Sequence, residues 1–159
     1  MKQIELGALV RDKITGFEGT AMTRATWMYG CNTYDVQPKI DKDGKVPDQV
    51  AFDEPQLEVI EESSSDMELP EEPETIVELG SKVKDPVSGT EGTVTARCFF
   101  LNGCVRVCVQ PKQMPGKQEI KNIWIPEQQA EIIVKSEPVK AKHKVGGPQM
   151  STSIDRSTS

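Results

Sequence analysis

Residues 6–39 read LGALVRDKITGFEGTAMTRATWMYGCNTYDVQPK, and residues 79–112 repeat this pattern as LGSKVKDPVSGTEGTVTARCFFLNGCVRVCVQPK. One constant shift aligns residues 4–60 with residues 77–133 without a gap, and roughly a third of the aligned positions are identical. A gapless internal repeat of this length means that one supersecondary unit occurs twice. We therefore predict two copies of the same fold, called copy one and copy two below.

Each copy shows the pattern of a small all-β unit, with short β-rich runs between turn residues. In copy one we expect strands at residues 8–11, 19–27, 31–36, 49–52 and 57–60, with one helical turn before the last strand. In copy two the corresponding strands are expected at residues 81–84, 92–100, 104–109, 122–125 and 130–133. Five strands in so short a segment predict a closed SH3-like barrel, and an open two-sheet sandwich is the alternative.

Turn residues recur at equivalent places in the two copies. They are Gly16, Gly19, Gly30 and Asp12 in copy one, and Gly89, Gly92, Gly103 and Asp85 in copy two. We expect each repeated glycine to mark a backbone position where a Cβ atom would clash. We expect each aspartate to cap a turn through its side chain rather than to act as a catalytic base.

The long hairpin assigns side chains to two faces. Asn102-Gly103 in copy two, and Tyr29-Gly30 in copy one, are predicted to form a two-residue turn. This register places Cys98, Phe100, Val105, Val107 and Val109 on the core face, with Ala25, Trp27, Tyr34 and Val36 as their counterparts in copy one. The opposite face is the predicted partner-binding surface, and its candidate residues are Phe99, Leu101, Cys104, Arg106 and Cys108, together with Met28 and Cys31.

Composition shifts predict four segments: a barrel at 1–60, an acidic linker at 61–76, a barrel at 77–135 and a tail at 136–159. The linker carries seven carboxylates and no cation, so we expect a solvated spacer. The tail is basic and then Ser/Thr-rich, which predicts disorder in the free chain. No stretch reads as a signal peptide or as a membrane span.

Charge and residue chemistry narrow the classes of function. The formal net charge is -6 with a pI near 4.9, which disfavours nucleic acid as a partner. Four cysteines and one histidine show no Cys-x-x-Cys spacing, so we expect no metal, no cofactor and free thiols by default. The equivalent Arg24 and Arg97 could contact phosphate or pair with a carboxylate such as Glu54 or Glu127, and we expect the ion pair. We find no candidate catalytic residue.

The segments GFEGTA at 16–21 and GTEGTV at 89–94 resemble the Gly-x-x-Gly-x-Val turn of KOW-type SH3-like barrels in ribosomal proteins and elongation factors. Those modules place lysine before the first glycine, whereas this chain has Thr15 and Ser88. The full repeat, from the Leu-Gly pair through Gly-Cys to Val-Gln-Pro-Lys, is similar to small uncharacterised proteins of tailed bacteriophages. That resemblance implies a phage protein and carries no activity.

These observations together predict a non-enzymatic phage protein that binds other proteins. The leading hypothesis is an accessory virion component, such as a decoration, neck or tail-associated subunit, with self-association as an open option. It would reside in the virion or the host cytoplasm. One alternative is an intracellular phage effector that binds a host protein or small molecule, and the other is a KOW-type nucleic-acid binder.

Overall fold

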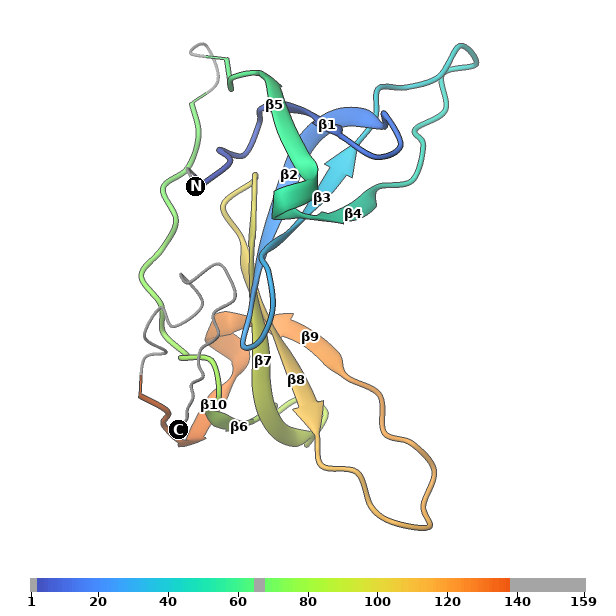
Figure 1. Ribbon diagram of the computed structural model, residues 1–159. Helices are drawn as coiled ribbons and strands as arrows, with labels where there is room; N and C mark the ends of the chain where they lie inside the picture. The colour runs from blue at the N-terminus through green and yellow to red at the C-terminus, as the bar shows by residue number, and fades with distance from the viewer. Residues whose placement is uncertain (1–2, 65–67, 138–159) are drawn as a thin grey trace, which may run out of the picture.

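The computed structural model describes residues 3–64 and 68–137, which form an all-β, antiparallel molecule (Figure 1). Copy one comprises β1 (Leu9–Asp12), β2 (Glu18–Trp27), β3 (Thr33–Gln37), β4 (Val50–Asp53), the 3₁₀ turn η1 (Glu54–Gln56) and β5 (Leu57–Glu61). Copy two comprises β6 (Lys82–Lys84), β7 (Glu91–Phe100), β8 (Val105–Pro111), β9 (Ile123–Pro126), η2 (Glu127–Gln129) and β10 (Glu131–Val134). The tail from residue 138 onward lies outside the described residues.

The two copies have the same strand order. It is β5-β1-β2-β3-β4 in copy one and β10-β6-β7-β8-β9 in copy two. In the described part of the chain, β4 pairs only with β3 and β5 only with β1. The sheet therefore does not close, and the predicted closed barrels are not confirmed.

The copies are joined through their long central strands. β2 and β7 pair antiparallel, with Arg24 opposite Phe99 and Ala25 opposite Cys98, and this pairing fuses all strands into one ten-stranded sheet. Figure 1 shows β2 and β7 side by side between the two halves. Because Ala25 and Cys98 are equivalent in the repeat, the copies meet in the manner of an isologous dimer. The sequence predicts two modules separated by a solvated spacer, whereas the structure joins the two copies in one sheet.

Each hairpin tip also docks on the other copy. The Met28 N–H donates to the Thr95 carbonyl oxygen (2.8 Å), and the Leu101 N–H donates to the Met22 carbonyl oxygen (2.8 Å). Met28 is equivalent to Leu101, and Met22 to Thr95, so the two hydrogen bonds are reciprocal. Both acceptors lie at the irregularities where the β2–β3 and β7–β8 registers shift. Such bulges bend a strand and re-aim its side chains.

Two apolar cores lie on the inner side of the sheet. The core of copy one contains Ile4, Leu6, Ala8, Val10, Ala21, Tyr34, Val36 and Leu57, and it also takes in Phe99 and Val105 of copy two. The core of copy two contains Val77, Val83, Val94, Val107, Val109 and Ile125. Phe99 is only 7% exposed, so copy two contributes a large aromatic side chain to the interior of copy one.

The hairpin register differs from the predicted one by one residue. Phe100 N–H donates to the Cys104 carbonyl oxygen (2.9 Å), which leaves residues 101–103 as a three-residue loop ending in Gly103 at φ +93°. Three-residue loops with a final glycine at positive φ are a common hairpin form. Phe99 thus faces Val105, and this slip moves Phe99 to the inner side and Phe100 to the outer side.

The repeated glycines have two different roles. A Cβ atom at Gly19 would lie 2.6 Å from the Gln37 carbonyl oxygen, and one at Gly92 would lie 2.3 Å from that of Gln110. Neighbouring strands approach too closely there for a side chain. Gly16 and Gly89 have open space around the Cβ position but φ values of +80° and +79°. At these two turns glycine is required by conformation rather than by the predicted clash.

Asp12 caps the β1–β2 turn. Its carboxylate accepts hydrogen bonds from the Thr15 N–H (2.9 Å) and hydroxyl (2.5 Å) and from the Gln56 amide (3.0 Å). Asp85 makes the same set with Ser88 (3.2 and 2.6 Å) and Gln129 (2.7 Å). Each aspartate therefore ties its turn to the 3₁₀ turn of the same copy.

The hydrogen bonds to Asp85 make the free energy of unfolding depend on pH. The hydroxyl of Ser88 and the amide of Gln129 hold the pKa of Asp85 down at about 2. Because the folded-state pKa lies below the unfolded value of about 3.9, this stabilisation is present above pH 4 and is lost as the pH falls towards 2. We expect Asp85→Asn to be less stable than the wild type at pH 7. The gap, measured by urea unfolding, should shrink between pH 4 and pH 2; a constant gap contradicts this assignment.

Candidate partner-binding surface and the buried arginine pair

The seven predicted partner-binding residues do not share one exposed face. Phe99 is in the core of copy one, Leu101 packs against that core, and Cys108 is buried. Cys104, Arg106 and Cys31 are exposed, and Met28 is half-buried at the tip of the β2–β3 hairpin. The one-residue slip explains the difference, because it turns Phe99 inward while leaving Arg106 on the outer side.

The outer side of the joined sheet has its own row of side chains. Trp27 lies opposite Ala96, Ala96 opposite Cys108, and Cys108 opposite Trp124, so one row crosses β2, β7, β8 and β9. The two indole rings meet edge to face with centroids 6.1 Å apart. They flank the small side chains between them, which contributes to the burial of Ala96 and Cys108 on this face.

A second group of side chains lies at the other end of this outer face. The guanidinium of Arg106 sits 5.8 Å from the centroid of the Phe100 ring. Half-buried Asp35 lies on the same face, and burial raises the pKa of its carboxyl group. The outer face thus presents Trp27, Trp124 and Phe100 with Arg106 over a floor of small residues, and Trp124 is 40% exposed.

The sequence places none of these three aromatic residues on the outer face. Trp27 and Phe100 are expected in the core, and Trp124 is not singled out. The alternation around Trp124 carried the signal, because Ile123 and Ile125 flank it and pack towards the core of copy two. In a strand with that alternation, the residue between two core positions points to the other face.

The four cysteines are free thiols in two environments. Cys31 and Cys104 are exposed at the hairpin tips, whereas Cys98 and Cys108 are buried. Burial raises the pKa of Cys98 to about 12, so its reactive thiolate is scarce at neutral pH. We expect iodoacetamide to modify Cys31 and Cys104 in the folded protein and all four thiols in urea, as counted by mass spectrometry. Rapid modification of Cys98 without urea would contradict the sheet pairing.

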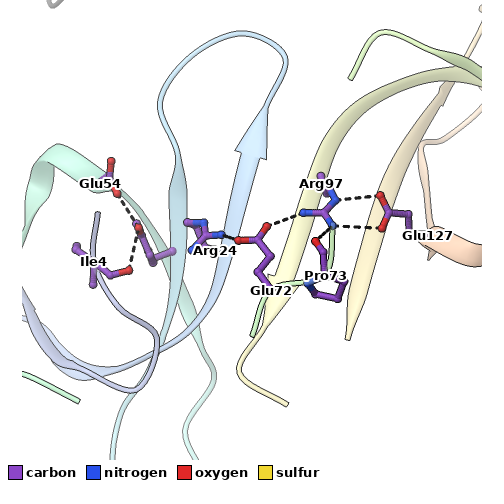
Figure 2. A network of polar contacts seen from close by, with 8 residues as sticks. Ile4, Arg24, Glu54, Glu72, Pro73, Arg97 and Glu127 are labelled. Carbon is purple, nitrogen blue, oxygen red and sulfur yellow. Dashed lines mark hydrogen bonds and ion pairs between the residues drawn. The ribbon is translucent and has the colours of Figure 1, made fainter. Parts of the chain in front are cut away.

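On the inner side of the joined sheet, two equivalent arginines share one carboxylate (Figure 2). Arg24 on β2 and Arg97 on β7 are 7% and 8% exposed. Glu72 from the linker lies between them, with one oxygen paired to Arg24 and the other 2.6 Å from Arg97 Nη1. Arg97 Nη2 also donates to the Pro73 carbonyl oxygen (2.9 Å). The linker is therefore not a free spacer along its whole length, because Glu72 and Pro73 contact two buried arginines.

Glu127 completes the network on the side of copy two. It is 1% exposed and accepts hydrogen bonds from Arg97 Nε (3.0 Å) and Nη2 (3.3 Å). It also accepts the N–H groups of Ile76 (3.1 Å) and Val77 (3.2 Å), which fixes the end of the linker. Burial opposes the charged form of Arg97, but Glu127 and Glu72 outweigh it and raise the pKa of the guanidinium.

The equivalent position in copy one has a different partner. Glu54 accepts the Tyr34 hydroxyl hydrogen (2.6 Å), and this bond together with burial raises the pKa of the phenol. Both arginines therefore have the carboxylate partner that the sequence predicts, Arg24 in Glu72 of the linker and Arg97 in Glu127 and Glu72. Two guanidinium groups and two carboxylates make the network neutral, which offsets the cost of burying Arg24, Arg97 and Glu127, while Glu72 reaches solvent.

Among residues 3–64 and 68–137, no group of three or more His, Cys, Asp or Glu side chains gathers as a metal site would require. In the same part of the chain, no helix has the length and apolar character needed to cross a lipid bilayer. Comparisons of the chain with protein-family models, with curated proteins and with solved structures find no match.

Proposed function

We propose that this chain is a non-enzymatic protein-binding module that serves as an accessory structural protein of a tailed-phage virion, at a decoration, neck or tail position. The observation that carries the binding function is the outer sheet face with Trp27, Phe100, Trp124 and Arg106. Tryptophan and arginine dominate the energetics of protein interfaces, and a rigid sheet presents them at little entropic cost. The virion role rests on the similarity of the repeat to phage proteins.

An SH3-like assignment of each copy belongs to the same proposal. Each copy has the order β5-β1-β2-β3-β4 or its equivalent, and a 3₁₀ turn precedes its last strand. That layout supports a pair of open SH3-like units that are joined at β2 and β7. SH3-like units host many unrelated functions, so the site and not the fold carries the function.

Mass spectrometry of purified particles of the encoding phage tests the virion role. We expect the chain to co-purify in a fixed ratio to the capsid or tail subunits, and its absence from the particles would overturn this role.

Trp124→Ala tests the outer sheet face. Loss of a central interface tryptophan costs about 2 kcal/mol or more, so the affinity for the partner should fall by roughly thirtyfold. The control is Ile14→Ala, which removes an exposed apolar side chain from the β1–β2 turn.

The intracellular effector uses the same protein-binding face and differs in where its partner is. Fractionation of infected cells separates the two functions. A virion protein sediments with the particles, whereas an effector stays with a soluble host protein. If Trp124→Ala and Ile14→Ala bind the partner equally well in either fraction, the outer face does not carry the binding.

A further inference from the structure

Two hollows on copy two share lining residues and together form one groove. A hollow of about 850 Å³ runs from the β2–β3 hairpin tip, at Trp27 and Met28, over Thr93 on β7. A second hollow of about 680 Å³ continues between the β6–β7 turn and the loop at 111–122. Glu91, Pro111, Lys112 and Gln113 line both hollows. Copy one therefore supplies one wall of a groove whose floor belongs to copy two.

The groove is basic, although the whole chain is acidic. Its charged lining residues are Lys82, Lys112, Lys117 and Glu91, three cations against one anion, so its net charge is +2 in a chain of net charge -6. None of the three lysines forms an ion pair with another described residue. Their charges are available to a ligand of opposite sign.

Both ends of the groove are apolar. Trp27, Met28 and Ile133 lie at one end, and Met114 and Ile120 lie at the other. Met114 is 59% exposed and therefore accessible to a ligand in the groove. The loop that carries it is held in place, because Gln113 hydrogen-bonds to both the carbonyl oxygen (2.8 Å) and the N–H (2.9 Å) of Ile120. A preformed wall lowers the entropic cost of binding.

The equivalent surface of copy one lacks these features. The shift that relates the copies places Leu9 at the position of Lys82, Gly44 at that of Lys117 and Asp41 at that of Met114. Two of the three cations and one apolar end are therefore specific to copy two. Lys39, the equivalent of Lys112, is exposed and does not line either hollow, so it provides a matched control on copy one.

We propose that this groove binds an extended, acidic segment of a partner protein, with carboxylates on Lys82, Lys112 and Lys117 and apolar side chains at the two ends. This inference rests on the proposed protein-binding function and names the chemistry of one partner segment. An extended chain fits because it can lie along both hollows at once, past the shared residues Glu91, Lys112 and Gln113, and reach the apolar side chains at either end. A nucleic acid fits less well, since a strong phosphate-backbone complex needs several cationic contacts and the rest of the chain repels it.

Fluorescence anisotropy with the full chain tests the proposal. The probes are three labelled peptides with the same leucines and phenylalanine, in which the remaining positions are all glutamate, all glutamine or all lysine, and a labelled oligo-dT strand. We expect the glutamate peptide to bind best. Lys112→Glu together with Lys117→Glu should weaken it by about tenfold or more, whereas Lys39→Glu should leave it unchanged.

Several results would overturn the proposal. The proposal fails if the three peptides bind equally well or if the glutamate peptide does not bind. It also fails if Lys39→Glu weakens binding of the glutamate peptide as much as the double variant does, or if oligo-dT binds more tightly than every peptide. The substituted residues Lys39, Lys112 and Lys117 are exposed, so we expect the variants to fold, and circular dichroism checks this. If the peptides fail while the chain still associates with its particle or host partner, the groove assignment falls and the proposed protein-binding function stands.

Discussion

Replacing Phe99 by alanine is expected to lower the free energy of unfolding by about 3–5 kcal/mol, the range for truncating a buried phenylalanine. Phe99 belongs to copy two but packs with Tyr34, Val36 and Leu57 in the core of copy one. Its removal leaves a cavity in copy one and weakens the attachment of β7 to β2. Urea unfolding followed by tryptophan fluorescence measures the change.

The matched control for Phe99→Ala is Thr26→Ala. Thr26 is the equivalent residue of copy one and is exposed, so its truncation should change stability by no more than about 0.5 kcal/mol. Hydrogen exchange gives a second readout, because Phe99→Ala should speed exchange in β1 and β3, far away in the sequence. If exchange rises only within copy two, Phe99 does not stabilise the core of copy one.

Glu127→Ala is expected to destabilise the protein by about 3 kcal/mol, because it removes a partner of the buried Arg97 and leaves the Ile76 and Val77 N–H groups without an acceptor. Glu72 still neutralises part of the charge of Arg97, which keeps the loss below that of an isolated buried cation. Thermal and urea unfolding measure the effect.

Glu54→Ala serves as the comparison in copy one. Glu54 accepts one hydrogen bond, from the Tyr34 hydroxyl, so its loss should cost about 1 kcal/mol. Equal losses in the two variants would mean that Arg97 does not depend on Glu127. Glu127→Gln should recover part of the stability, because its amide oxygen can still accept from Arg97 while the negative charge is gone.

The sequence predicts the strands well because the repeat supplies two readings of each one. Turn residues such as Asp12 and Gly16 recur at fixed offsets in copy two, and each predicted strand lies within two residues of the observed one. Turn signals of this kind are short-range and survive in a single sequence. The repeat does not fix the ion pairs in the same way, because Arg97 pairs with Glu127 whereas the equivalent Arg24 pairs with Glu72 of the linker.

The faces of the long hairpin were harder to predict. Asn102-Gly103 fits a two-residue turn, but the observed loop has three residues, and a slip of one position exchanges the two faces. Phe99 was therefore expected to meet a partner and instead lies in a core. The Thr95 irregularity adds a second change of direction that no residue type signals.

The joining of the copies could not be read from local patterns. The sequence of β2 does not indicate that its second half pairs with β7, because that pairing uses backbone N–H and C=O groups, which every strand has. The role of Glu72 was hidden for a related reason. The linker composition indicates solvation on average, and one carboxylate among seven lies between two buried guanidinium groups.

The pairing of β2 with β7 has a consequence for assembly. Two separate chains that met through equivalent strands would come apart on dilution, whereas these halves are covalently tethered and meet at a high effective concentration. Their association is therefore insensitive to how much protein the cell makes. Because the two halves belong to one chain, their sequences need not be identical, as those of a homodimer must be. Tyr34 and its counterpart Val107 can therefore pack in cores of different composition.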